Sequence, residues 1–231
     1  MGDETRRLVA VIIPAKDEEQ RIANVIKAAL GSKLATEIIV VSDGSTDRTA
    51  EVAGRFEGVT VHTLPYNMGK GAAMAFGVSK TKADVIAFVD ADLQDLHGEH
   101  IDLILRPVLQ NECEVCIGVF RGGKFWSDTA QKFAPYISGQ RAMKRWIFDG
   151  TPYLDELRFG AEMALNHQAK RVKARVRRVV LRGVSNCFKE KKMGLGKGLI
   201  ARTKMYDEIY QTMMRNRKRR KPPRGGPRWK K

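Results

Sequence analysis

The sequence is poor in cysteine and has no long apolar run. Three of its 231 residues are cysteine, and an odd number cannot form a complete disulfide framework. No stretch comes near the roughly 18 consecutive apolar residues of a membrane-spanning helix. The first seven residues, MGDETRR, lack the apolar segment of a secretory signal peptide. These absences predict a cytoplasmic protein whose thiols stay reduced.

Acidic residues are also scarce relative to basic ones. The 42 Lys and Arg residues outnumber the 26 Asp and Glu residues, which gives a net charge of +16. Ten of these cations and no anions fall in residues 215–231, RNRKRRKPPRGGPRWKK, which leaves +6 on residues 1–214. A segment so rich in charge, Pro and Gly cannot bury a core. We therefore expect one domain, residues 1–214, followed by a disordered basic tail, residues 215–231.

The tail has three functional interpretations. Attraction to an anionic membrane surface, at about 1 kcal/mol per cation, would hold the domain peripherally at the cytoplasmic membrane face. A nucleic-acid-binding role would make this a protein of another class, and a solubilising role is the third option. Nucleic acid is the weaker interpretation, because the charge outside the tail is modest and the sequence has no aromatic-rich basic motif.

Short apolar runs alternate with amphipathic stretches along the first half of the chain. Their spacing predicts strands at 8–13, 37–41, 59–62, 85–89 and 115–119, and helices at 17–30, 47–56, 67–79 and 100–110. This order predicts an α/β fold: an open, mostly parallel, Rossmann-like sheet with helices on both faces. Further on we expect an interrupted helical stretch over 138–168, a strand over 171–182 and a last helix over 200–214.

Two carboxylates follow the fourth predicted strand directly. Ligands of open parallel sheets bind beyond the carboxyl ends of the strands, which is where Asp90 and Asp92 are expected. Two charges beside an apolar strand are costly unless they are neutralised. Mg²⁺ or Mn²⁺ would neutralise them and would stabilise a diphosphate leaving group. The alternative is a turn in which an Asp caps the next helix.

Two other motifs allow a functional and a structural interpretation. In the loop Asn67-Met-Gly-Lys-Gly71, glycines would let backbone N–H groups approach a phosphate at a helix start, or Asn67 would simply cap that helix. Cys113 and Cys116 have the CxxC spacing of a zinc site. No second pair with matching spacing follows, so we interpret these cysteines as structural.

Four segments together resemble family 2 glycosyltransferases of the GT-A fold. They are VIIPAKDEE (11–19), IIVVSDGSTDRT (38–49), NMGKG (67–71) and FVDADLQ (88–94), and SGQRA (138–142) and residues 159–182 are similar to later parts of the family pattern. The resemblance implies transfer of a sugar from a UDP- or GDP-linked nucleotide diphosphate sugar with Mg²⁺ or Mn²⁺. The chain departs from the pattern at Lys16, where an aromatic residue or Thr is frequent, and at Ser42, which replaces an Asp.

The resemblance also implies roles for single residues. The nucleotide-sugar site would be lined by Pro14, Ala15, Glu18, Asp43, Gly69, Lys70, Asp90, Ala91 and Asp92. The metal ligands would be Asp90, Asp92 and, as in polyprenyl-phosphate sugar transferases, Gln94. Asp92 would act in catalysis together with Arg121 and Arg141, which match positions that hold phosphate groups.

The acceptor follows from acid–base chemistry. An inverting transfer to a hydroxyl needs a general base. Asp155, Glu156 and Glu162 are the candidates, and none of them stands out from surface residues or partners of cations. A phosphate acceptor is already ionised and needs cations for positioning. The excess of Lys and Arg therefore favours a phosphorylated acceptor, first a polyprenyl phosphate. A small acceptor such as phosphoglycerate and a saccharide hydroxyl are the alternatives.

Overall fold

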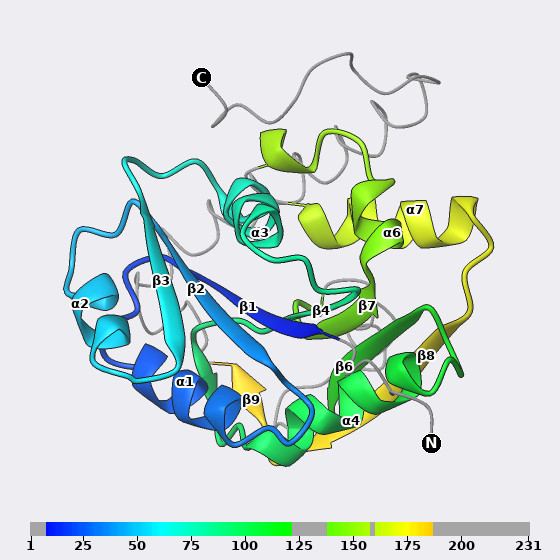
Figure 1. The fold of residues 1–231 in the computed structure, drawn as a ribbon, viewed down its shortest axis with the longest axis horizontal. Coiled ribbons are helices and arrows are strands. Elements are labelled where there is room, and N and C mark those ends of the chain that lie inside the picture. The colour runs from blue at the N-terminus through cyan, green and yellow to red at the C-terminus, as the bar shows by residue number, and fades with distance from the viewer. Residues whose placement is uncertain (1–7, 122–137, 158–159, 187–231) are drawn as a thin grey trace, which may run out of the picture.

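The computed structural model describes residues 8–121, 138–157 and 160–186 (Figure 1). The expected last helix (200–214) and the basic tail (215–231) lie outside these residues. No helix in the described part of the chain is both long and apolar enough to cross a membrane.

The first half alternates strands and helices, as the sequence predicts. Its elements are β1 (Val9–Ala15), α1 (Ile22–Leu30), β2 (Glu37–Asp43), α2 (Thr49–Gly54), β3 (Val59–Leu64), α3 (Lys70–Ser79), β4 (Val85–Phe88), β5 (Leu93–Gln94), α4 (Gly98–Leu109) and β6 (Val115–Arg121). The second half contains β7 (Arg141–Lys144), α6 (Arg145–Asp149), a 3₁₀ turn η1 (Leu154–Glu156), α7 (Ala161–Arg171), β8 (Val176–Arg182) and β9 (Ser185–Asn186).

Seven of the strands form one mostly parallel sheet, which confirms the predicted α/β fold. The strand order is β3-β2-β1-β4-β7-β6-β8, and β5 pairs with β9 in a separate ribbon. The strand β7 alone runs antiparallel to its neighbours β4 and β6 in that sheet. On one face lie α1, α2 and α4, and on the other lie α3, α6 and α7 (Figure 1).

The strand β7 corrects the expectation of a helical stretch over 138–168. Its residues Arg141, Ala142 and Met143 include good helix formers, which explains the prediction. In the fold they fill the gap between β4 and β6 and pair with both strands. Tertiary pairing therefore overrides the local propensity of this segment.

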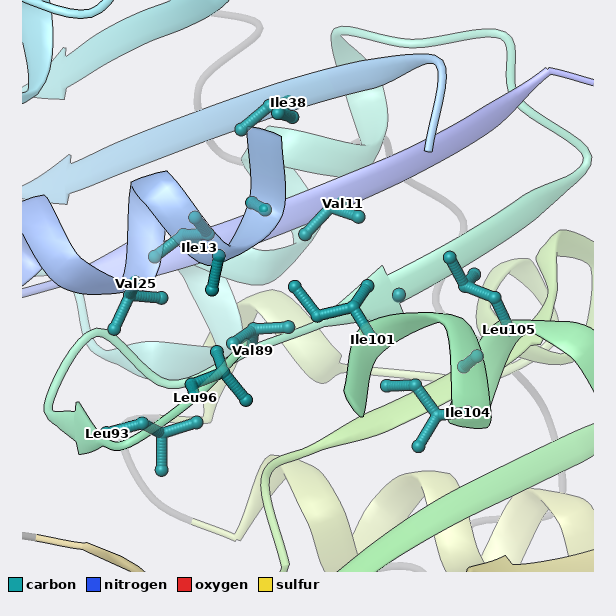
Figure 2. Close-up of a cluster of buried hydrophobic side chains, with 14 of the residues drawn as sticks. Val11, Ile13, Val25, Ile38, Val89, Leu93, Leu96, Ile101, Ile104 and Leu105 are labelled. Atoms are coloured by element: carbon teal, nitrogen blue, oxygen red, sulfur yellow. The ribbon is translucent and has the colours of Figure 1, made fainter. Parts of the chain in front are cut away.

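Both faces of the central strands are buried, which accounts for the continuous apolar runs. Alternate residues of β1 point to opposite layers, so Val11 and Ile13 pack toward α1 and α4 while Ile12 packs toward α3. Figure 2 shows the first of these layers, where side chains of β1 meet Val25 of α1 and Ile101 of α4. The two layers hold the sheet rigid, and its carboxyl edge can then support a site.

Two helices on this face cross at a pair of glycines. A Cβ atom at Gly98 would lie 2.2 Å from the carbonyl carbon and oxygen of Gly31. Beside the crossing, the Asp102 carboxylate accepts hydrogen bonds from the Ser32 hydroxyl at 2.5 Å and from the Lys33 N–H at 3.2 Å. The first turns of α4 are thus hydrogen-bonded to the segment that follows α1.

We expect Gly98→Ala to lower the free energy of unfolding by about 1–3 kcal/mol, because the added methyl group must push two backbones apart. Gly54→Ala is the matched control. Among the described residues no atom lies within 4 Å of that Cβ, and Ala is the better helix former. Urea denaturation of both variants checks this, and equal stabilities would refute the close crossing.

Candidate active site

The sheet order defines where a ligand crevice should form. From β1 the chain moves outward to β2 and β3, then returns to place β4 on the other side of β1. Ligands of open α/β sheets bind at such a switch point, beyond the carboxyl ends of the strands. Here the chain leaves these ends at Lys16 after β1 and at residues 89–92 after β4.

A lysine from a distant helix neutralises the first carboxylate of this edge. The Lys70 Nζ at the start of α3 lies 2.5 Å from Asp90 Oδ1 and 2.5 Å from Glu162 Oε1 in α7. The Gln140 amide donates a hydrogen bond to the other Asp90 oxygen at 2.7 Å. The three charged side chains are mostly buried, with exposed fractions of 30% for Lys70, 20% for Asp90 and 13% for Glu162.

The charges in this cluster hold one another ionised. Burial alone would lower the pKa of Lys70, but the charges of Asp90 and Glu162 raise it well above its ordinary value. Burial alone would raise the pKa of Glu162, but the charges of Lys70 and Arg141 hold it below its ordinary value of 4.5. The cluster is therefore a set of charged groups at neutral pH, and not a set of neutral acids.

Arg141 lies beneath this cluster and has no exposed surface. Its Nη1 donates to the Glu162 carbonyl oxygen at 3.2 Å and to Asn166 Oδ1 at 3.1 Å, and its Nη2 donates to the Ser138 carbonyl oxygen. Its Nε is buried without a hydrogen-bond partner in the described part of the chain. The structure thus places Arg141 as a buried counter-charge, and a contact with an acceptor phosphate stays a prediction.

Gly139 makes room for the Asp90 carboxylate. A Cβ atom at this position would lie 2.3 Å from Asp90 Oδ2. The small residue before Gln140 allows the segment that enters β7 to bring the Gln140 amide against the carboxylate. Gln140 is the residue of this cluster that the sequence does not single out, and the sequence marks Glu162 only as a candidate base. Both lie in segments that carry the resemblance.

The loop before α3 encloses a carboxylate of the protein itself. Asp43, at the end of β2, accepts hydrogen bonds from the Met68 N–H at 2.7 Å and the Gly69 N–H at 2.8 Å. The Gly71 N–H donates to the Leu157 carbonyl oxygen at 3.0 Å. A phosphate bound to these N–H groups would have to displace those acceptors. Contacts of Asp43, Gly69 and Lys70 with a nucleotide stay predictions.

The loops after β1 and β2, which belong to the segments 11–19 and 38–49, are hydrogen-bonded to each other. The Glu18 N–H donates to the Thr49 hydroxyl at 2.8 Å, and the Thr46 N–H donates to Asp17 Oδ1 at 2.7 Å. Pro14 is half-buried and Ala15 is buried at the end of β1, next to this loop pair. The polar residues of both motifs therefore hold the predicted nucleoside pocket in shape, and their contact with a nucleoside stays a prediction.

The predicted metal ligands have different surroundings. Asp92 is half-buried and Gln94 is exposed on β5, which pairs with β9. Carboxylate and amide oxygens suit Mg²⁺ and Mn²⁺, which often take one or two protein ligands and complete their shell with water and substrate phosphates. The described residues contain no ready cluster of three or more His, Cys, Asp or Glu for a metal. The donor set fits a metal that is shared with a diphosphate.

Arg121 and Ala91 complete the set of predicted site residues. Ala91 is buried between the two carboxylates. Arg121 is the last residue of β6, opposite Arg182 of β8, and β7 separates it from the end of β4. The cluster around Lys70 and the end of β6 thus lie at the same edge of the sheet. A contact between Arg121 and this cluster stays a prediction.

Comparisons with known proteins agree with this fold. The model of the family described as Glycosyl transferase family 2 matches residues 10–165, so the chain belongs to this family of GT-A glycosyltransferases. The 4,4'-diaponeurosporenoate glycosyltransferase of Staphylococcus haemolyticus (strain JCSC1435) is 39% identical over 114 residues, which are 47% of this chain and 29% of that protein. Its counterpart in Staphylococcus aureus (strain USA300) is 32% identical over 111 residues, 46% and 30% of the two chains.

Solved structures of a second kind of enzyme match over more of the chain. The glucosyl-3-phosphoglycerate synthase from Mycobacterium tuberculosis, in complex with Mn²⁺, uridine diphosphate and phosphoglyceric acid, has a TM-score of 0.65 and 25% sequence identity. The match covers 78% of this chain and 71% of that chain. By contrast, this chain spans less than a third of the length of the curated relatives named above.

The charge cluster makes a prediction about stability. We expect Lys70→Met to lower the free energy of unfolding at pH 7 by about 3–5 kcal/mol, because it leaves two buried carboxylates without their cation. Glu162→Gln should cost less, since Lys70 keeps Asp90 as a partner. The double variant should be more stable than the sum of the two single effects predicts, and additivity in urea denaturation would contradict the cluster.

The same experiment has a pH dependence with a definite sign. The pKa of Glu162 is lower in the folded state than its ordinary 4.5, so its stabilising contribution is present above that value and is lost as the pH falls through the folded-state pKa. Wild type should therefore lose more stability than Glu162→Gln on acidification below about pH 4.5.

Proposed function

We propose that this chain transfers a sugar from a UDP- or GDP-linked nucleotide diphosphate sugar to a phosphorylated acceptor, first of all a polyprenyl phosphate. The observation that carries the proposal is the pair of carboxylates at the switch point, Asp90 in an ion pair with Lys70 and Asp92 half-buried two residues further on. A small acceptor such as phosphoglycerate and a saccharide hydroxyl are the alternatives within the class.

The carboxylates have separate roles in this proposal. Asp92 and Gln94 would hold Mg²⁺ or Mn²⁺, and the bound metal would offset the charge that develops on the diphosphate leaving group. Asp90, which accepts hydrogen bonds from Lys70 and Gln140, is oriented by the protein and would position the donor. Pro14, Ala15 and Glu18 would enclose the nucleoside beside it.

The state of Glu162 favours an acceptor that is already ionised. Its lowered pKa and its ion pair with Lys70 make it a weak base for removing a proton from a hydroxyl. Asp155 and Glu156 lie on η1, just before Leu157, whose carbonyl oxygen accepts a hydrogen bond from the Gly71 N–H of α3. The relatives named above refer in their names or titles to a carotenoid acid and to phosphoglyceric acid. Both compounds are anions at neutral pH, which suits an acceptor that is positioned by cations.

Binding of the donor tests the proposal first. We expect UDP or GDP to stabilise the wild-type protein in a thermal-shift assay when Mn²⁺ is present, since a ligand at 100 times its dissociation constant adds about 2.7 kcal/mol. Asp92→Asn should lose at least tenfold in affinity. Asp95→Asn, an exposed carboxylate three residues further on, should behave as wild type. A metal-dependent shift that survives in Asp92→Asn would overturn the metal assignment.

Incubation of the protein with a radiolabelled donor sugar and different acceptors measures the acceptor preference. Transfer to undecaprenyl phosphate and not to neutral saccharides supports the proposal, transfer to phosphoglycerate selects the alternative, and transfer to saccharide hydroxyls refutes the requirement for an ionised acceptor.

The basic segment 215–231 would hold the domain at the membrane that carries such an acceptor. Deleting it should abolish co-sedimentation with anionic liposomes at low salt while leaving UDP or GDP binding intact. Equal sedimentation with and without the segment, or a preference for nucleic acid over liposomes, would sink this role.

A further inference from the structure

Lys16 lies next to Ala15, one of the residues predicted to line the nucleoside pocket. It follows Ala15, the last residue of β1, and its Nζ donates a hydrogen bond to the Gly44 carbonyl oxygen at 2.6 Å. The same ammonium lies 3.1 Å from Asp17 Oδ2, and its side chain is 32% exposed. Within the described part of the chain these contacts use two of its three N–H groups, so the third remains for another acceptor.

The two anchors of this ammonium are themselves held in place. Gly44 has a φ of 56°, and a Cβ atom there would lie 2.3 Å from the carbonyl carbon of Tyr66, so the turn sits directly against the segment before α3. Asp17 accepts hydrogen bonds from the Thr46 N–H at 2.7 Å and the Thr46 hydroxyl at 3.2 Å. The position of the Lys16 ammonium is therefore defined by a backbone carbonyl on one side and by an anchored carboxylate on the other.

The position relative to the sheet indicates which part of a nucleotide would meet Lys16. In β1 and β2 the register pairs Ala15 with Ser42, so Lys16 and Gly44 lie beyond the carboxyl ends of these two strands. In a mononucleotide-binding half of this type, phosphates lie near the switch point. Here that point is at the end of β4, where Asp90 and Asp92 stand. The nucleoside would then extend away from β4, over β1 and β2.

We propose that Lys16 is a specificity-determining residue that donates a hydrogen bond to an oxo group of the nucleobase, and so selects uracil or guanine over cytosine or adenine. This inference rests on the function proposed above. Uracil O4 and guanine O6 accept hydrogen bonds, whereas cytosine and adenine carry an amino group at the equivalent position. When an ammonium faces an amino group, two hydrogen-bond donors face each other and neither has an acceptor. A site that is built to donate to an oxo group therefore binds such a base more weakly.

Calorimetric titration with UDP, CDP, GDP and ADP in the presence of Mg²⁺ tests the inference. Wild type should bind UDP over CDP, or GDP over ADP, by about tenfold or more. Lys16→Met keeps the aliphatic length and removes the donor, so the preference should fall by about tenfold, mainly through weaker binding of the oxo base. Lys16→Arg should keep the preference, and Lys27→Met, on the exposed side of α1, should leave all four affinities unchanged.

The outcomes separate this inference from the proposed function. Metal-dependent binding of a nucleotide with the same base preference in wild type and Lys16→Met would overturn the role of Lys16 and leave the function standing. An equal loss for all four nucleotides would also overturn it, because Lys16 would then only fasten the turn at Gly44. Failure of wild type to bind any of the four would refute the proposed function itself.

Discussion

The ammonium of Lys70, placed between Asp90 and Glu162, is the interaction on which the candidate site depends. Two mostly buried carboxylates this close would repel each other, and one of them would take up a proton if no cation lay between them. The lysine opens α3, one carboxylate follows β4, and the other lies in α7, 92 residues beyond the lysine. One cation thus joins the motif-rich first half of the domain to its second half.

The cluster is balanced in charge, but this balance alone does not make it strongly stabilising. Beside the two carboxylates lie two cations, Lys70 and the fully buried Arg141. Taking four charges out of water costs much of what their attraction returns, so an apolar replacement could be as stable. What the charges provide is geometry: Asp90 has a donor on each oxygen, and its direction is set. A site that must present a carboxylate to a ligand needs this constraint more than it needs stability.

Local patterns account for the part of the fold and site that the sequence predicts. Asp17, Glu18, Thr46 and Thr49 contact one another across two loops, and each loop follows an apolar strand whose end is easy to locate. The second half of the fold is harder to predict from the sequence, because the residues that contact one another there are distant along the chain. The strand β7 is built from helix formers and exists because β4 and β6 leave a gap between them. Glu162 lies on an ordinary amphipathic helix, and nothing local marks it as the partner of Lys70.

The acidic residues Asp43, Asp90 and Asp92 differ in their surroundings, and we expect them to differ in their roles. Asp43 shapes the α3 loop, with both oxygens engaged by backbone N–H groups. Asp90 is neutralised by Lys70, so its charge adds little to the attraction for a second cation. In the function proposed above, Asp92, two residues beyond Asp90, would supply a carboxylate to the metal. A metal held by so few protein oxygens binds well only when a diphosphate supplies the rest of the shell. In the function proposed above, binding of the metal would therefore depend on binding of the donor.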